Sequence, residues 1–116
     1  MFNKFQSEEL VKYLGELVNE QSDRIQPYYQ ILDKKSEKPY VMHEKTNQIT
    51  VILRGKGIAI IDDQKIELKK NDILLLSTKT KHSFVSQDEE LELFHIHIPA
   101  GEVENDRYIL KENCME

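Results

Sequence analysis

The chain has 116 residues, a formal net charge of −5, 32% charged residues and 39% hydrophobic residues. This balance is typical of one globular domain with a modest core, and it excludes an intrinsically disordered chain. The acidic net charge argues against a nucleic-acid-binding surface, and no apolar run reaches the roughly 20 residues that cross a membrane. Because the start of the chain lacks the apolar core of a signal peptide, we expect a cytoplasmic protein.

The first predicted element is a helix over residues 7–20. Ser7 is a suitable N-cap, and the leucines that follow repeat at helical spacing and form one apolar stripe. The stripe either packs on the sheet of its own domain, which we favour, or serves as a dimer arm. We assign residues 1–26 to this helix and a linker, and residues 27–116 to a single domain.

From residue 27 onward the sequence changes to short segments rich in Ile, Val, Leu, Tyr and Phe, separated by turn residues. No helical pattern interrupts these segments, which is typical of an antiparallel sandwich or barrel. The predicted fold class is therefore all-β. The predicted strands cover residues 28–33, 39–43, 48–54, 57–62, 65–69, 72–77, 83–87, 91–98 and 107–111.

A polar loop between two of these strands resembles the second motif of the cupin superfamily. That motif contains a glycine, a proline, a second glycine and a histidine, and here its frame falls on Asn71, Ser77, Lys79 and His82. The histidine matches, whereas the proline and the second glycine are replaced. The resemblance, which covers residues 40–98, implies a jelly-roll barrel, also called a double-stranded β-helix, with a binding bowl.

The first cupin motif contains two histidines, a glutamate and a glycine. Its frame falls on Val41, His43, Gln48 and Gly55, so one histidine and the glutamate are replaced. The resemblance implies that the inner face of each strand looks into the bowl. His43, Gln48 and His82 are then neighbours, and they are what remains of the family's set of four metal ligands.

The resemblance implies, as one option, a divalent transition metal (Fe, Mn, Ni or Zn) held by His43, Gln48 and His82. Imidazole suits these ions, but the Gln48 amide brings no charge and Val41 cannot ligate. A bowl that binds its ligand without metal is the other option.

A further histidine pair, His95 and His97, lies two residues apart and shares one face of a predicted strand. If that face looks into the bowl, either histidine can substitute for the missing ligand. The opposite face of the strand is more apolar, so we favour a partly exposed pair that points outward or lies at the mouth of the bowl.

Within the superfamily, the chain most resembles the sugar-sensing domain of arabinose-operon-type (AraC-like) regulators. Residues 50–76, TVILRGKGIAIIDDQKIELKKNDILLL, carry the shared strand–hairpin–strand order, and the polar loop, the histidine and a further strand follow. No DNA-binding helical module follows, so the resemblance implies a stand-alone cupin without a nucleic-acid partner. Cupins commonly pair through their sheets, which implies a homodimer.

These observations predict a small cupin that binds a small polar ligand, a sugar or an organic acid, in its bowl. The alternatives are a metal-dependent cupin enzyme of dioxygenase or isomerase type, and a structural module with a dead site. Whether the chain is an enzyme stays open, and no catalytic residue is assigned. Arg54 can hold an acidic group or simply end a hairpin at the surface. The candidate ligand-binding residues are His43, Gln48, Thr50, Arg54, His82 and Phe84.

Overall fold

The computed structural model describes residues 2–4, 26–98 and 106–113, and every regular element within them is a β-strand. The helix predicted over residues 7–20 lies outside the described residues. The described part of the chain holds no helical segment that could cross a lipid bilayer. The strands are β1 (Phe2–Lys4), β2 (Gln26–Leu32), β3 (Tyr40–Met42), β4 (Asn47–Arg54), β5 (Gly57–Ile61), β6 (Gln64–Leu68), β7 (Ile73–Leu76), β8 (His82–Ser86), β9 (Leu91–Ile98) and β10 (Tyr108–Lys111).

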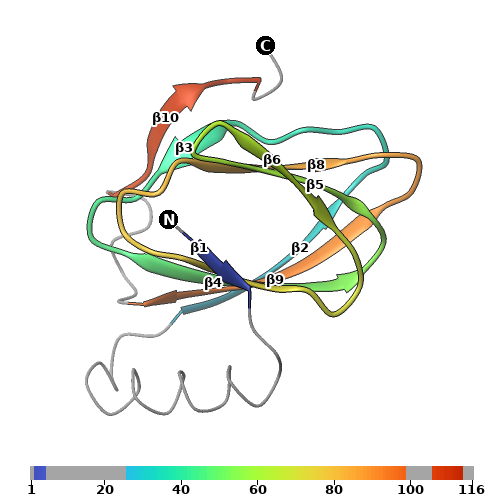
Figure 1. Ribbon diagram of the computed structural model, residues 1–116, viewed down its shortest axis with the longest axis horizontal. Coiled ribbons are helices and arrows are strands. Elements are labelled where there is room, and N and C mark those ends of the chain that lie inside the picture. The colour runs from blue at the N-terminus through green and yellow to red at the C-terminus, as the bar shows by residue number, and fades with distance from the viewer. Residues whose placement is uncertain (1, 5–25, 99–105, 114–116) are drawn as a thin grey trace.

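The strands form two five-stranded antiparallel sheets. One sheet has the order β1-β7-β4-β9-β2, and the other has the order β10-β3-β8-β5-β6. Figure 1 shows the two sheets facing each other. From β2 to β10 each strand lies in the other sheet from the one before it, except for the hairpin of β5 and β6, which stays in one sheet. This is consistent with the jelly-roll arrangement that the resemblance to cupins implies.

Every predicted strand after residue 27 is present, with ends that differ by no more than two residues. The strand β1 was not predicted, because three residues are too few to show an alternating pattern. Its backbone pairs antiparallel with β7, with Asn3 opposite Leu75.

Alternation along β4 and β9 separates the inside of the barrel from the outer face of the first sheet. Ile52 lies opposite Leu93, and both are fully buried inside the barrel. The intervening residues point outward, where Ile49 belongs to a second apolar cluster. The interior cluster consists of Leu32, Ile52, Ala59, Ile61, Leu68, Leu74, Leu76, Phe84, Leu91 and Leu93.

The interior changes from apolar to polar along these same two strands. After the Ile52–Leu93 pair, the next inward pairs are Thr50 with His95 and Gln48 with His97. One end of the barrel is therefore filled with aliphatic side chains, and the other end holds polar ones. This division places the site at the polar end.

Two turns use backbone conformations that few residues adopt. Asp62 and Asp63 link β5 to β6 with φ angles of 46° and 69°, which suits a tight hairpin turn. Gly55 has a φ of 92°, and a Cβ atom there would collide with the carbonyl oxygen of Glu90. Only glycine fits this position without strain.

Candidate functional site

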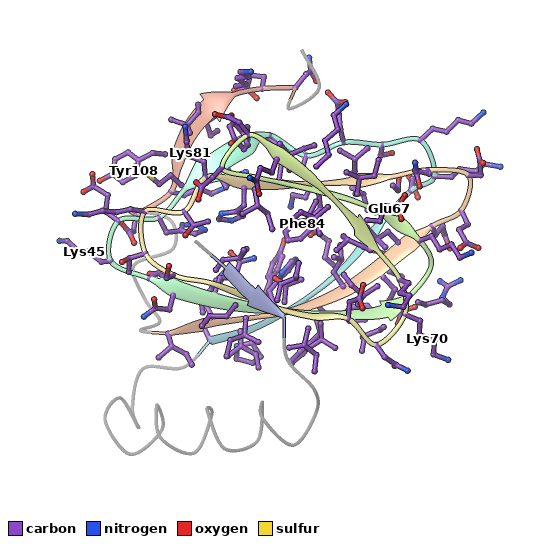
Figure 2. All side chains as sticks on the ribbon, in the orientation of Figure 1. Lys45, Glu67, Lys70, Lys81, Phe84 and Tyr108 are labelled. Atoms are coloured by element: carbon purple, nitrogen blue, oxygen red, sulfur yellow. The ribbon has the colours of Figure 1, made fainter. Side chains whose placement is uncertain are left out.

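A cavity of about 540 Å³ opens at the polar end of the barrel. This volume lies within the range of small-molecule pockets. Figure 2 shows Phe84 between the two sheets, and its ring lies 5.4 Å from that of His95 and 6.3 Å from that of His82. The cavity, called the bowl below, is lined by Gln26, Tyr28, Lys38, Pro39, Val41, His43, Gln48, His82, Ser83, Phe84, His95, His97 and Arg107.

His43 belongs to the first motif and His82 to the second, but the two rings lie side by side, with centroids 5.2 Å apart. The Nδ1 of His43 lies 3.0 Å from the carbonyl oxygen of Asp106, and the Nδ1 of His82 lies 2.9 Å from that of Thr80. A carbonyl oxygen only accepts, so both Nδ1 atoms carry the proton. The Nε2 atom of each ring therefore keeps its lone pair.

The expectation that His95 and His97 point outward is wrong. Only 4% and 7% of their surfaces are exposed, and both rings line the bowl. The expectation assumed that the more apolar face of the strand turns inward. Instead, Ile96 and Ile98 pack with Ile49 on the outer side of the sheet, while the interior at this end is polar.

Gln48 connects these two histidines. Its Oε1 accepts a hydrogen bond from Nε2 of His97 at 3.2 Å, and its Nε2 donates to Nδ1 of His95 at 3.1 Å and to Thr50 Oγ1 at 2.9 Å. The Thr50 hydroxyl in turn donates to Nδ1 of His95 at 2.7 Å. The opposite ring nitrogen of His95 donates to Gln30 Oε1 at 3.2 Å. A carboxylate at position 48 could not donate, so this network uses the amide specifically.

All four histidines are held in the neutral form. Burial lowers the pKa of His82 to about 3 and that of His97 to about 4, and it lowers the pKa of His95 well below the usual value. Burial also lowers the pKa of His43, against the raising effect of the Asp106 carbonyl. The positive charge of one ring would repel that of its neighbours, so the cluster favours neutral imidazoles at physiological pH.

The structure brings five of the six candidate ligand-binding residues together and leaves one out. Arg54 is exposed on the outside, where its guanidinium pairs with Glu92 at 2.9 Å and Glu90 at 3.3 Å. The pairing between β4 and β9 shifts register between Ile52 and Arg54, so the alternation that would point Arg54 inward is broken there. Thr50 contributes through its bond to His95 rather than by lining the bowl.

Two basic residues of the bowl, Lys38 and Arg107, were not among the sequence candidates. Arg107 continues the register of β10 on β3, where Tyr108 lies opposite Met42, so it reaches the level of His43. That pairing joins segments far apart in the sequence, and no local pattern signals it. Lys38 directly precedes Pro39, at the start of a predicted strand. A lysine in that position is as common on an exposed surface as in a pocket, so the sequence does not mark it as a site residue.

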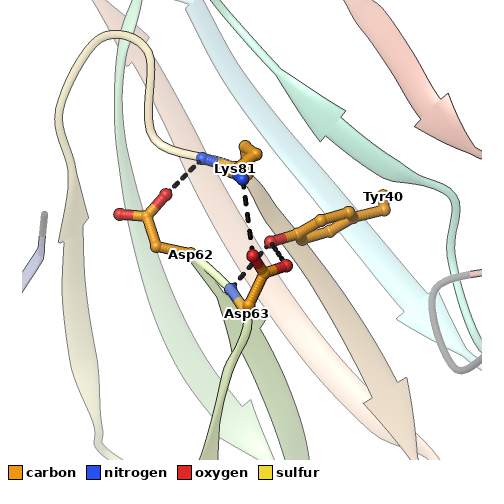
Figure 3. A network of polar contacts seen from close by, with 4 residues as sticks. All are labelled: Tyr40, Asp62, Asp63 and Lys81. Atoms are coloured by element: carbon orange, nitrogen blue, oxygen red, sulfur yellow. Dashed lines mark hydrogen bonds and ion pairs between the residues drawn. The ribbon is translucent and has the colours of Figure 1, made fainter.

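A polar network holds the loop that delivers His82. The Tyr40 hydroxyl donates to Asp63 Oδ1 at 3.0 Å and accepts from the Asp63 N–H at 2.9 Å (Figure 3). The Lys81 N–H donates to Asp62 Oδ1 at 3.0 Å, and its ammonium lies 3.4 Å from Asp63 Oδ2. Burial and Asp63 raise the pKa of Tyr40 to about 12. These contacts tie the loop to the β5–β6 turn. The loop itself has Ser77 and Lys79 at the positions where the cupin motif has proline and glycine.

The donors in the bowl fit a divalent transition metal in kind. His43, His82 and His97 each keep one ring nitrogen with a lone pair, and imidazole nitrogen suits such ions. The described residues that line the bowl include no carboxylate to offset the charge of the ion. Among the residues that the structure describes, no three His, Cys, Asp or Glu side chains are placed to hold one ion together. The arrangement is that of a hydrogen-bonded pocket.

Comparison with known proteins agrees with this architecture. The sequence profile of the cupin domain matches residues 28–99. No matching sequence was found among curated proteins.

Three solved structures illustrate the similarity of fold. KdgF from Halomonas sp. is 16% identical, with 70% of this chain and 74% of that one covered and a TM-score of 0.65. The salicylate 1,2-dioxygenase of Pseudoaminobacter salicylatoxidans is 12% identical, with coverages of 91% and 37% and a TM-score of 0.67. The plu4264 protein of Photorhabdus luminescens is 14% identical, with coverages of 64% and 62% and a TM-score of 0.58. This chain spans less than two thirds of the last two proteins.

Proposed function

The chain belongs to the cupin domain family, and we propose that it binds a small polar ligand, a sugar or an organic acid, in the bowl. The observation that carries the proposal is an open cavity of about 540 Å³ whose polar side chains are already ordered by hydrogen bonds. A site ordered before binding loses less entropy when the ligand arrives. Such a bowl suits selective recognition of one ligand.

Three ring nitrogens supply the polar contacts of the proposed site. The ring nitrogens of His43, His82 and His97 that carry no proton are hydrogen-bond acceptors, and they match hydroxyl donors on a ligand. Tyr28 adds a flat apolar surface at the mouth, where its ring lies 5.9 Å from that of His95 in a stacked arrangement. Phe84 supplies the apolar floor.

A metal-dependent enzyme of dioxygenase or isomerase type is the second candidate function. The neutral histidines favour it, because a lone pair on each ring is what a metal ligand needs. Iron, manganese, nickel or zinc would be held by His43, Gln48 and His82, with His97 available where Val41 cannot ligate. When bound, the ion would act as a Lewis acid on a ligand oxygen.

The proposal includes a biological setting that the resemblance suggests. The protein would act in the cytoplasm as a homodimer that pairs through its sheets, and it would respond to its ligand as the sensing domain of AraC-like regulators does. Size-exclusion chromatography with light scattering tests the dimer: a mass of 13.7 kDa in solution contradicts it.

Ligand binding is tested by thermal shift against a panel of sugars and small organic acids. A ligand of the folded state raises the melting temperature as its concentration rises. The shift should disappear in His43→Ala and His82→Ala and persist in Arg54→Gln, whose side chain lies outside the bowl. A ligand that still shifts both histidine variants binds elsewhere and contradicts the proposal.

Elemental analysis of the purified protein separates the two candidate functions. Stoichiometric metal that is lost in both His43→Ala and His82→Ala supports the enzyme. Protein that shows the ligand-induced shift without metal supports the binding module.

A further inference from the structure

Among the residues that the structure describes, the bowl carries positive charge and no acid. Lys38, from the segment between β2 and β3, and Arg107, directly before β10, both line it, and its described lining includes no Asp or Glu. The ion pairs of the described residues involve Arg54, Lys69 and Lys81 and include neither of these two side chains. This stands in contrast to the net charge of −5 for the whole chain.

Asp106, the acid nearest to Arg107 in sequence, is occupied elsewhere. Its two carboxylate oxygens accept hydrogen bonds from the backbone N–H groups of Glu44 and Lys45 at 3.0 and 2.9 Å. Its carbonyl oxygen accepts from His43. It therefore orders the edge of the bowl; its carboxylate acts on His43 but is not among the groups that line the cavity.

The two cations act on each other and on the histidines. Burial, and then the charge of Arg107, lower the pKa of Lys38. The charge of Lys38 also contributes to the lowered pKa of His82, and Arg107 contributes to that of His43. Lys38 is half-buried, whereas Arg107 is exposed. No described acid forms an ion pair with Lys38, so its partly buried charge is costly, and a bound anion would reduce that cost.

We propose that the bowl selects small organic acids, with Lys38 and Arg107 binding the ligand's carboxylate at the rim and the imidazoles facing its uncharged remainder. This inference rests on the proposed function and narrows its ligand from a sugar or an organic acid to the acid. The planar guanidinium of Arg107 matches a carboxylate with two parallel hydrogen bonds, and the Lys38 ammonium adds a point charge beside it.

The backbone at Lys38 is fixed before any ligand binds. Its N–H donates to the Phe84 carbonyl at 3.1 Å, and its carbonyl accepts from Ser83 Oγ at 2.7 Å. Neither bond uses the side chain, so Lys38→Met should fold. Because the substitution removes a half-buried charge and its repulsion from Arg107, we expect the ligand-free variant to melt at the same temperature as the parent or higher.

The test uses acids and uncharged partners of matched shape: glucuronate with glucose, succinate with succinamide, and benzoate with benzyl alcohol. Binding is measured by calorimetry and thermal shift at low and high salt. At least one acid should bind about tenfold more tightly than its partner, and salt should weaken the binding of the acid only.

Lys38→Met and Arg107→Gln should each weaken binding of that acid about tenfold and leave its uncharged partner unaffected. The matched controls are Lys65→Met and Arg54→Gln, which remove the same charges from exposed positions outside the bowl. Both controls should bind the acid as the parent does.

Four results would overturn the inference, and they differ in what they say of the proposed function. Equal binding of acids and uncharged partners overturns the inference alone, as does undiminished acid binding in both bowl variants. Tighter binding of inorganic phosphate than of any carboxylate overturns the carboxylate assignment. If neither acids nor uncharged partners bind, the inference and the proposed function fail together.

Discussion

The four neutral histidines make stability depend on pH in a defined direction. The pKa of a histidine in the unfolded chain is about 6.5, whereas burial lowers the pKa of His82 to about 3 and that of His97 to about 4. Each lowered pKa therefore contributes stability that is present above about pH 6.5 and is lost as the pH falls towards the folded pKa. At about pH 5 the loss is about 2 kcal/mol for each of these two residues, and His95 adds to it in the same direction. A loss of about 4 kcal/mol is a large share of the stability of a small domain.

Urea unfolding between about pH 7.5 and about pH 5, followed by circular dichroism, measures this loss. The matched variant is His97→Gln, because a glutamine amide can still donate to Gln48 Oε1 but does not titrate. Carboxylates titrate equally in both proteins, so the difference isolates the histidine. The variant should lose about 2 kcal/mol less than the parent on acidification. Identical pH profiles, or histidine NMR titrations in the folded protein centred near pH 6.5, would refute the reasoning.

Three further predictions concern the loop, the hairpin and the metal. Tyr40→Phe removes the hydroxyl that bonds to Asp63, so we expect a loss of about 1 kcal/mol in the free energy of unfolding and faster hydrogen exchange at the Lys81 amide; unchanged exchange would mean that the network does not hold the loop. Gly55→Ala forces a Cβ atom against the Glu90 carbonyl at a φ of 92°, so urea unfolding should show a loss of about 2 kcal/mol or more, while Lys56→Ala next to it should change little. Gln48→Glu adds a negative charge that the described lining of the bowl does not supply, so mass spectrometry should find more bound zinc or iron than in the parent, and equal content would count against these donors as a metal site.

The all-β fold class could be predicted from local features of the sequence, and the jelly-roll arrangement from the resemblance to cupins. Short alternating segments, turn residues such as Asp62 and Asp63, and the absence of a helical pattern after residue 27 all report on neighbouring residues. The predicted strands are present with small differences at their ends. Strand formation depends on that local alternation, so the sequence carries it directly.

The orientation of the site residues was harder to predict because the usual rule fails at the polar end of the barrel. The strand β9 carries His95 and His97 on one face and Ile96 and Ile98 on the other, and the apolar face normally turns inward. Here the apolar face joins a cluster on the outside of the sheet. Arg54 shows the same limit, since a register shift after Ile52 breaks an alternation that the sequence alone predicts to continue.

The sequence by itself determined the strands, the cupin frame and the placement of His43, Gln48 and His82 within that frame. Only the tertiary structure decided that His95 and His97 share the bowl with them, that Arg54 leaves it, and that two cations enter it. The physical reason is that a side chain's environment depends on which distant strand packs against it. For the polar loop before His82, local sequence showed only that proline and glycine were missing. Long-range contacts from Asp62 and Asp63 to Lys81 hold the loop instead, and Tyr40 fixes Asp63.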